Sequence, residues 1–558
     1  MNPPPHATRT RDPYSQIVYY GFMKWCRIRG MLLAVCVFML MSLPVSPLSP
    51  AAQELIRQRE LVIALDQSYV NFNPHEAWSI EMAQVFSAMS EGLFSYHPAT
   101  MEPLPALAAS VENLDPYTWR IFLRRDGRFS NGDPITAHTF VDSWRALIAP
   151  GASHQYASML DIIRGVREYR TRRPSRDQQP LGFYAEDTYT LMLELTAPAP
   201  YLLSILCHHS FSAVHPDNLA SPSSETPSGF ISSGPFAVES VSGDEILMVR
   251  NPYYWDAASV ALERVRFRYY DSPLALVGDF EQALVHWSLQ YIQPSLISDR
   301  SLLTGYPEYS TGFYYFSAVR GPYADPRVRT ALSLLVPWEA LRNPQIFFAP
   351  ASSLVPPTAS YYGAQGPVRQ DRARAQQLLA QAGFPEGRGL PPLKIAVYPG
   401  SLLEQTTRSI AEIWSNELRI EVSVDVRPYS EYASGDTALQ YDLAFMSWIG
   451  DFFDPYSFLA LWHSESSLNL GSQFNPIYDS MVERALKTYD VQERYQQFVK
   501  AEQYLLDQGT VLPLFHGVSL NFFQDALVGG WIPNLLDIHP IKYLYFIDRS
   551  PASEERRL

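Results

Sequence analysis

LRRDGRFSNGDPITAHTFVDSWRAL, residues 123–147, carries the most specific structural signal in this chain. Just before it, apolar and polar side chains alternate over residues 119–123, which is typical of a strand with one buried face. Asn131-Gly132 is a strong signal for a tight turn, and Thr136 is a residue type that caps the start of a helix. These residues therefore predict a strand, a tight turn and a helix in direct succession.

The same residues resemble the most characteristic signature of oligopeptide-binding proteins, which are members of the family of ABC-importer solute receptors. In that signature LR-x-G-x-F-S-(N/D)-G is followed by x-P-x-T-A-x-D-F-V-x-S-W, and this chain departs from it at Thr139, where relatives usually carry Asp. The resemblance gives these residues a structural role in a small domain. Further matches extend it over about residues 55–548: Glu91-Gly92-Leu93, Gly234-Pro235-Phe236, Arg250–Asp256, Asp325–Leu332 and Leu378–Phe384.

The resemblance implies an α/β chain with the two-lobed periplasmic-binding-protein fold, type II, with an extra small domain, mixed sheets and a hinge between the lobes. Lobe 1 would be built from separate segments, with lobe 2 inserted between two chain crossings near residues 305 and 515. The implied divisions are an N-terminal extension and signal peptide (1–52), lobe 1 (53–95, 197–304 and 516–548), the small extra domain (96–196), lobe 2 (305–515) and a charged tail (549–558).

Tyr441–Trp462, YDLAFMSWIGDFFDPYSFLALW, contains the best candidate for a binding site. A strand-like alternation runs to Trp448 and stops at Gly450, and Asp451 and Asp454 then appear within a run of aromatic side chains. A carboxylate at the end of a strand, surrounded by aromatics, suits a cationic ligand group in a water-poor cleft. The alternative is that both aspartates only cap the turn before the next helix, and this capping role is the one we expect for Asp454.

This region also resembles the strand and turn of oligopeptide-binding proteins, in which a Tyr-Asp strand leads to Gly/Ser-Trp and then to an Asp that binds the amino terminus of the peptide. That Asp falls on Asp451, and the family's Trp falls on Trp448. We expect Trp448 and Phe452 to exclude water from the bound ammonium. The resemblance implies the following ligand-binding residues: Ser447, Trp448, Ile449, Asp451, Phe452, Tyr156, Trp78, Ser79 and Ile80.

The far end of the ligand is less well defined by the sequence. Close relatives place an Arg two residues before the Gly/Ser-Trp pair to meet the peptide carboxylate, and that position is Phe445 here. A free carboxylate would lack this partner, so the length or the class of the ligand can differ. Some relatives bind sugars, haem, glutathione or nickel chelates, and these non-peptide solutes stay open as alternatives.

Two polar clusters fall outside the candidate site. Cys207, His208, His209 and His215 are residue types that ligate metals, but their spacing is not that of a known zinc site, and we predict neither a metal nor a cofactor. Arg164–Arg176 holds six arginines and resembles a solvated loop of the small domain. Nucleic acid is a poor partner for it, because the net charge of the chain is −14.

The N-terminal residues indicate export. Lys24, Arg27 and Arg29 precede an apolar run over residues 31–48, and small residues follow. This order is typical of a secretory signal peptide, with cleavage near Ala51 or Ala52 and a periplasmic protein as the result. An uncleaved membrane anchor is the alternative.

The remaining question is the class of protein. The 558 residues are 47% hydrophobic and 18% charged, which is enough for a large packed core. No G-x-S-x-G, HExxH or P-loop pattern is present, so a secreted glycosidase-like enzyme and a surface adhesin are the weaker alternatives. We predict a monomeric receptor, not an enzyme, that captures short peptides between two lobes and delivers them to the permease and ATPase subunits of an ABC importer.

Overall fold

The computed structural model of the chain describes most of the residues after the N-terminal extension. All of its sheets lie in the compact unit Ala51–Leu558. The described residues are 48–65, 72–76, 79–152, 154–171, 180–220, 229–289, 292–317, 321–342, 348–428 and 440–548. The predicted signal peptide therefore lies outside them, apart from its last few residues, and so does the charged tail.

One mixed sheet of eleven strands dominates the described residues. Ten strands follow one another as β15 (Val422–Val426), β14 (Leu393–Val397), β16 (Leu443–Ile449), β12 (Leu303–Phe316), β17 (Val511–Phe523), β11 (Trp287–Ser288), β1 (Glu60–Leu65), β10 (Arg264–Tyr269), β9 (Glu245–Arg250) and β8 (Phe236–Ser242), and β13 (Phe348–Pro350) pairs with β17. β1 is parallel to β10 and β14 is parallel to β15, whereas β12 is antiparallel to β16 and β17.

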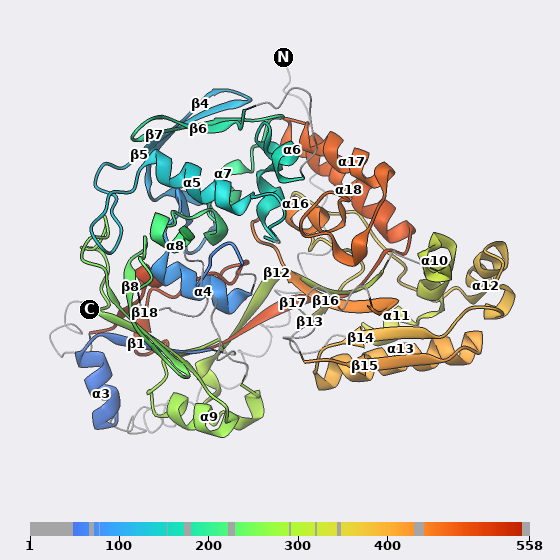
Figure 1. Cartoon of the computed structure of the whole chain (residues 1–558). Helices are drawn as coiled ribbons and strands as arrows, with labels where there is room; N and C mark the ends of the chain where they lie inside the picture. Colours follow the sequence, from blue (N-terminus) through green and yellow to red (C-terminus); the bar gives the residue numbers. More distant parts are fainter. Residues whose placement is uncertain are drawn as a thin grey trace, which may run out of the picture. The chain divides into compact units, whose positions relative to one another are not determined.

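The long strands β12 and β17 divide this sheet into two parts (Figure 1). β1 and β8–β11 lie on one side of the pair, and β14–β16 lie on the other. Residues 317–510 follow β12 and precede β17, so the backbone enters and leaves them through these two strands. We refer to residues 317–510 as the second lobe and to the rest of the compact unit as the first lobe. The pairing of β12 with β17 is irregular between Pro307 and Thr311, and an irregular ladder of this kind is a suitable place for a hinge.

The alternation predicted for β16 is confirmed, because the two faces of the strand enter different cores. Leu443 and Phe445 belong to a core within the second lobe. Ala444 is part of a second core, which Met446 and Trp448 cover and which also includes residues of the first lobe. One face of β16 therefore packs in the core of the second lobe, and the other face packs in a core shared with the first lobe.

The strand, turn and helix predicted from residues 123–147 are present in the first lobe. β5 (Thr118–Leu123) ends where the signature begins, Gly132 has a φ of +93°, and α5 starts at Ala137. Thr136 N donates to Thr139 Oγ1 over 3.1 Å, so the hydroxyl of Thr139 closes a capping box at the start of α5. β5 belongs to a four-stranded sheet ordered β4 (Ala108–Asp115), β5, β7 (Thr190–Glu194) and β6 (Phe183–Asp187).

Helices cover both lobes, and no described helix is long and apolar enough to cross a membrane. Those of the first lobe are α3 (Pro50–Arg57), α4 (Ile80–Met89), α5 (Ala137–Leu147), α6 (Val166–Arg170), α7 (Leu202–Ile205), α8 (Pro216–Ala220) and α9 (Pro273–Glu281). Those of the second lobe are α10 (Pro326–Leu335), α11 (Trp338–Leu341), α12 (Arg372–Gln381), α13 (Ser401–Leu418), α16 (Tyr456–Leu459), α17 (Pro476–Leu486) and α18 (Val491–Asp507). Two small antiparallel sheets of two strands each complete the fold: β2 (Phe94–Tyr96) with β3 (Pro103–Pro105), and β18 (Val528–Gly529) with β19 (Tyr545–Phe546).

The expectation that Asp454 only caps a helix is wrong. Asp454 Oδ1 does accept from Tyr456 N over 2.9 Å, but both carboxylate oxygens also bind the guanidinium of Arg494 on α18, at 2.8 and 2.7 Å. Arg494 is 1% exposed, and Tyr201 of the first lobe packs on its guanidinium at 4.5 Å. The two residues are 40 positions apart, so no local pattern could reveal the pair.

The first prediction concerns this ion pair. Asp454→Asn should lower the free energy of unfolding by about 3–5 kcal/mol, because it leaves the buried guanidinium of Arg494 without its counter-charge. Chemical denaturation followed by circular dichroism measures the change. Asp371→Asn is a matched control, since Asp371 caps α12 through Arg374 N at the surface and should cost about 1 kcal/mol or less. Equal losses in the two variants would contradict the prediction.

Candidate functional site

The candidate site lies at the turn that follows β16. Gly450 N donates to Tyr309 O over 2.9 Å, which fixes the end of the strand. A Cβ at Gly450 would lie 2.7 Å from the ring of Tyr309, so only glycine fits at this position. The main chain therefore lies directly against Tyr309 at the end of β16, and Asp451 is the first residue beyond the glycine.

Asp451 is enclosed by tyrosines of the opposite lobe. Tyr96 Oη donates to the main-chain oxygen of Asp451 over 2.8 Å, and the side chain of Tyr156 is hydrogen-bonded to the carboxylate. Asp451 Oδ2 is buried and has no hydrogen-bond partner among the described residues. Burial raises the pKa of Asp451 to about 8, although the hydrogen bond from Tyr156 acts in the opposite direction. The lobes thus meet around a carboxylate that keeps one oxygen available to a cation.

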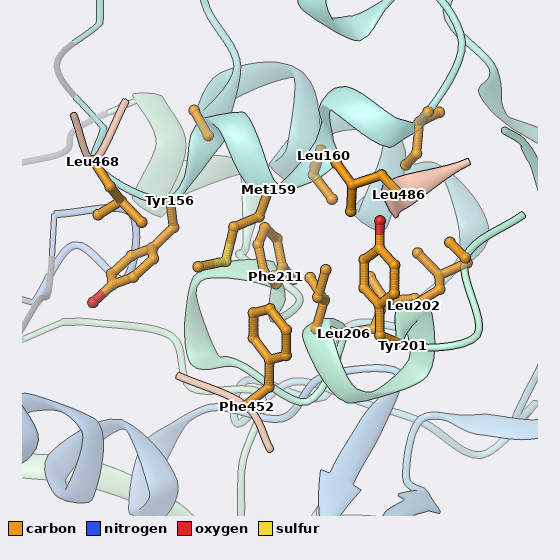
Figure 2. Close-up of a cluster of buried hydrophobic side chains, with 14 of the residues drawn as sticks. Tyr156, Met159, Leu160, Tyr201, Leu202, Leu206, Phe211, Phe452, Leu468 and Leu486 are labelled. Atoms are coloured by element: carbon orange, nitrogen blue, oxygen red, sulfur yellow. The ribbon is translucent and has the colours of Figure 1, made fainter. Parts of the chain in front are cut away.

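An aromatic and aliphatic wall adjoins this carboxylate (Figure 2). Phe452 follows Asp451, is 0% exposed, and projects from the second lobe toward Leu206 and Phe211 of the first. Its ring is stacked on Tyr201, with centroids 6.4 Å apart and an interplanar angle of 13°. Because these side chains exclude water, an ion pair formed at Asp451 would be stronger than one at the surface.

The other residues expected on the turn are placed less directly. Trp448 is half-buried, packs against the core shared by the lobes, and donates from Nε1 to Ser457 O over 3.1 Å. Its indole N–H is therefore engaged within the second lobe. Ile449 is half-buried and Ser447 is exposed. Asp451, Phe452 and Tyr156 are thus the predicted residues that the structure brings together, with Trp448 behind them.

The residues expected to pair with a ligand backbone are only partly described. Trp78 and the side chain of Ile80 lie outside the described residues. Ser79 is the N-cap of α4, with its hydroxyl accepting from Met82 N over 3.3 Å. Its side chain therefore has a structural function at the start of the helix.

Phe445, at the position where close relatives carry Arg, is fully buried. It lies on the face of β16 that enters the second-lobe core, and its ring packs on Tyr314 and Tyr398, with centroids 5.1 and 5.5 Å away. An aromatic cage of this kind offers no charge to a carboxylate. Among the described contacts of Phe445, therefore, none replaces the Arg that close relatives carry at this position.

The histidines of the Cys207–His215 cluster pack against aromatic rings of the first lobe: His208 on Tyr156, His209 on Phe86 and His215 on Phe129. Burial lowers the pKa of His208 well below its ordinary value, and its ring packs on Tyr156 at 4.2 Å between centroids. No group of His, Cys, Asp or Glu side chains suited to a metal occurs among the described residues.

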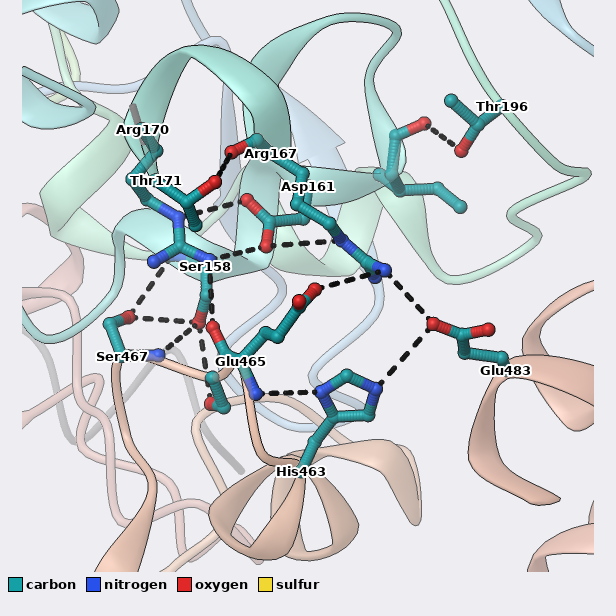
Figure 3. A network of polar contacts seen from close by, with 12 residues as sticks. Ser158, Asp161, Arg167, Arg170, Thr171, Thr196, His463, Glu465, Ser467 and Glu483 are labelled. Atoms are coloured by element: carbon teal, nitrogen blue, oxygen red, sulfur yellow. Dashed lines mark hydrogen bonds and ion pairs between the residues drawn. The ribbon is translucent and has the colours of Figure 1, made fainter. Parts of the chain in front are cut away.

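The interpretation of Arg164–Arg176 as a solvated loop is wrong for its described part. Arg164, Arg167 and Arg170 all engage carboxylates, and Arg167 and Arg170 also reach across to the second lobe (Figure 3). The arginines beyond Thr171 lie outside the described residues. Sequence composition cannot distinguish a solvated arginine from one paired with the opposite lobe, because the partners Glu465 and Glu483 are some 300 positions away.

Two tyrosines at the site were missed by the sequence analysis. Tyr96 lies at the end of β2 and holds the main chain of Asp451, and Tyr201 lies just before α7 and stacks on Phe452. Both come from the first lobe and approach a turn in the second. A buried tyrosine is common in any large core, so the sequence carried no signal that would have selected them.

Comparison with known proteins places this chain in one family. The family model described as "Bacterial extracellular solute-binding proteins, family 5 Middle" matches residues 102–469. The chain belongs to this family. It is 26% identical to the periplasmic oligopeptide-binding protein OppA of Salmonella typhimurium over 528 residues, which cover 89% of this chain and 94% of the relative.

Solved structures share the two-lobed fold. The murein tripeptide-binding protein MppA of Escherichia coli aligns with a TM-score of 0.78 and 24% identity, covering 88% of this chain and 99% of the other. Haemophilus influenzae OppA, in complex with the peptide RPPGFSPFR, aligns with a TM-score of 0.77 and 22% identity, covering 90% of this chain and all of the other. The predicted α/β, two-lobed periplasmic-binding-protein fold is confirmed, whereas the domain boundaries derived from the sequence stay predictions.

The second prediction follows from the burial of Asp451. When the lobes separate, water reaches its carboxylate and the pKa returns toward the ordinary value of about 4. A pKa that is raised in the closed arrangement means that closure is most favourable when Asp451 is protonated. The ligand-free closed arrangement should therefore lose stability as the pH rises from about 4 to about 8, by about 1.4 kcal/mol per pH unit.

Small-angle X-ray scattering of the ligand-free protein between pH 5 and pH 9 measures this effect, as a radius of gyration that grows with pH. Asp451→Asn should remove most of the dependence. Glu502→Gln is the matched control, because Glu502 is a second-lobe carboxylate whose pKa burial raises to about 7 and whose partners all lie in its own lobe. Identical profiles for the wild type and Asp451→Asn would rule out this coupling.

Proposed function

We propose that this protein is an extracytoplasmic receptor that captures short peptides between its lobes, with Asp451 as the group that binds the peptide's amino terminus. The observation that carries the proposal is that Asp451 Oδ2 is buried and has no hydrogen-bond partner among the described residues. The next residue, Phe452, is fully buried and helps to exclude water. An ammonium group would supply both the missing donor and the missing charge.

The rest of the proposed site follows from the contacts around this carboxylate. Tyr156 and Tyr96 would orient Asp451 from the first lobe, and Trp448 and Phe452 would shield it from water. Ser447 and Ile449 would line the cleft along β16, while Trp78, Ser79 and Ile80 would offer main-chain groups to an extended peptide.

The peptide-binding names of its relatives support the same proposal. We further propose that the protein acts in the periplasm as a monomer without enzymatic activity, and that it delivers its ligand to the permease and ATPase subunits of an ABC importer. The small extra domain (96–196) and the lobe boundaries at 305 and 515 belong to this proposal.

The third prediction tests the ammonium site directly. Asp451→Asn preserves the shape of the side chain but removes its charge, and it should weaken binding of tri-alanine about 30-fold to a few thousand-fold, since one partner of a buried charged pair is lost. N-acetyl tri-alanine should bind the wild type poorly and show little further loss in the variant, because both changes remove the same interaction.

Isothermal calorimetry of the two ligands with the two proteins gives the complete cycle, and Glu502→Gln serves as the control for loss of a buried carboxylate elsewhere in the lobe. Circular dichroism confirms that each variant is folded. If folded Asp451→Asn binds tri-alanine as the wild type does, Asp451 is not the amine site and a non-peptide solute becomes the better proposal.

The fourth prediction concerns the opposite end of the ligand. Because the aromatic cage around Phe445 offers no cation, blocking the carboxyl terminus of tri-alanine as an amide should change its affinity by less than tenfold, or about 1.4 kcal/mol. Competition calorimetry against unmodified tri-alanine measures the difference. A larger loss would show that another cation of the cleft binds the carboxylate.

A further inference from the structure

A second set of contacts, which does not include Asp451, joins the lobes (Figure 3). On the first lobe it comprises Ser158 and Asp161 of the short helix η1 (Ala157–Ile162) and Arg167 and Arg170 of α6. On the second lobe it comprises Glu465 and Ser467, which follow the short helix η7 (Ala460–Trp462), and Glu483 of α17. We call these seven residues the clamp.

The charged half of the clamp centres on Arg167. Its Nη1 lies 2.9 Å from Glu483 Oε1 and 3.5 Å from Glu465 Oε2. Arg170 donates from Nη2 to the main-chain oxygen of Glu465 over 2.8 Å. Asp161 holds both arginines on the first-lobe side, with Arg170 Nε 3.0 Å and Arg167 Nε 3.7 Å from its carboxylate oxygens. The arginines therefore lie between first-lobe and second-lobe acceptors.

The neutral half of the clamp is a reciprocal pair of serines. Ser158 N donates to Ser467 Oγ over 3.1 Å, Ser467 N donates to Ser158 Oγ over 3.0 Å, and the two hydroxyl oxygens are 2.8 Å apart. Ser158 is 7% exposed. The two serines are 309 positions apart in the sequence and belong to different lobes. Their hydrogen bonds can therefore form only when the lobes touch.

The clamp is continuous with the candidate site through the chain. Tyr156, which binds the carboxylate of Asp451, immediately precedes η1 and lies two residues before Ser158. Attaching Ser158 and Arg167 to the second lobe therefore restricts where the ring of Tyr156 can lie relative to Asp451. None of the clamp residues was expected to contact ligand.

We propose that Arg167 and Ser467 are positioning residues, which hold Tyr156 against Asp451 across the cleft and set how long a captured ligand stays bound. This inference extends the proposed function, but its geometric part concerns the lobes alone. Contacts between lobes favour the closed arrangement for every ligand by the same factor. Loss of the clamp should then speed release without changing the preference for a free amine.

The decisive experiment follows lobe closure without any ligand. Spin labels are placed at Leu274→Cys on the first lobe and Tyr362→Cys on the second, both on exposed side chains, with Cys26, Cys36 and Cys207 replaced by serine. Double electron–electron resonance at pH 5 gives the ratio of closed to open protein. Arg167→Ala and Ser467→Ala should each lower that ratio at least about threefold, and Arg167→Lys should restore part of it.

Arg164→Ala is the matched control. Arg164 lies three positions before Arg167 and pairs with Glu194 of the same lobe. The side chains of Arg164 and Glu194 are 28% and 32% exposed, close to the 30% and 35% of Arg167 and Glu483. It should leave the ratio unchanged. Raising the salt to 1 M should reduce the effect of Arg167→Ala but not that of Ser467→Ala.

A second readout is the release rate of tri-alanine, followed by stopped-flow tryptophan fluorescence. It should rise at least about threefold in both clamp variants and stay the same in Arg164→Ala. Failure of the wild type to bind tri-alanine would bear on the proposed function, while the spin-label ratio would still decide the inference. A closed-to-open ratio that Arg167→Ala and Ser467→Ala leave unchanged, or that Arg164→Ala lowers equally, would overturn it.

Discussion

The cost of burying a carboxylate governs the turn after β16. Asp451 and Asp454 are three residues apart: Asp454 is 5% exposed, and Asp451 is half-buried with its Oδ2 shielded from water. Asp454 receives a full bidentate partner from Arg494, so its charge is satisfied within the protein. Asp451 receives the hydroxyl of Tyr156 and keeps a buried oxygen without a described partner. The pair of Asp454 with Arg494 therefore stabilises the turn, whereas a charged Asp451 would be costly to bury without a cation.

Because Asp451, unlike Asp454, keeps a carboxylate oxygen without a described partner, closure of the lobes would be more favourable with a cationic ligand than without one. An unpaired charge opposes closure because water must be removed from it, and a bound ammonium removes that opposition. The fold supports such a response, since the backbone of the second lobe is reached through β12 and β17, whose pairing is irregular near Pro307. In the proposed function, Asp451 would therefore link lobe closure to the charge of the ligand.

Direct contacts between the lobes act alongside this electrostatic control. The stacking of Tyr201 on Phe452, the hydrogen bonds between the clamp serines and the ion pair of Arg167 with Glu483 each join a first-lobe residue to one within residues 452–483 of the second lobe. They are independent of what the cleft holds. In the receptor that we propose, Asp451 would select the ligand, and the contacts between the lobes would set how long it is retained.

Local sequence determined the elements and the family. The signature over residues 123–147 specifies its turn and helix through Gly132 and Thr136, whose effects act within a few residues, and the position of Asp451 after a glycine-terminated strand was visible as a pattern. Tertiary structure alone decided what those residues contact. The partner of Asp454, the tyrosines around Asp451 and the second-lobe acceptors of Arg167 lie between 40 and 355 positions away. Pairs so distant are created by the packing of two lobes, and no periodicity or spacing along the chain encodes them.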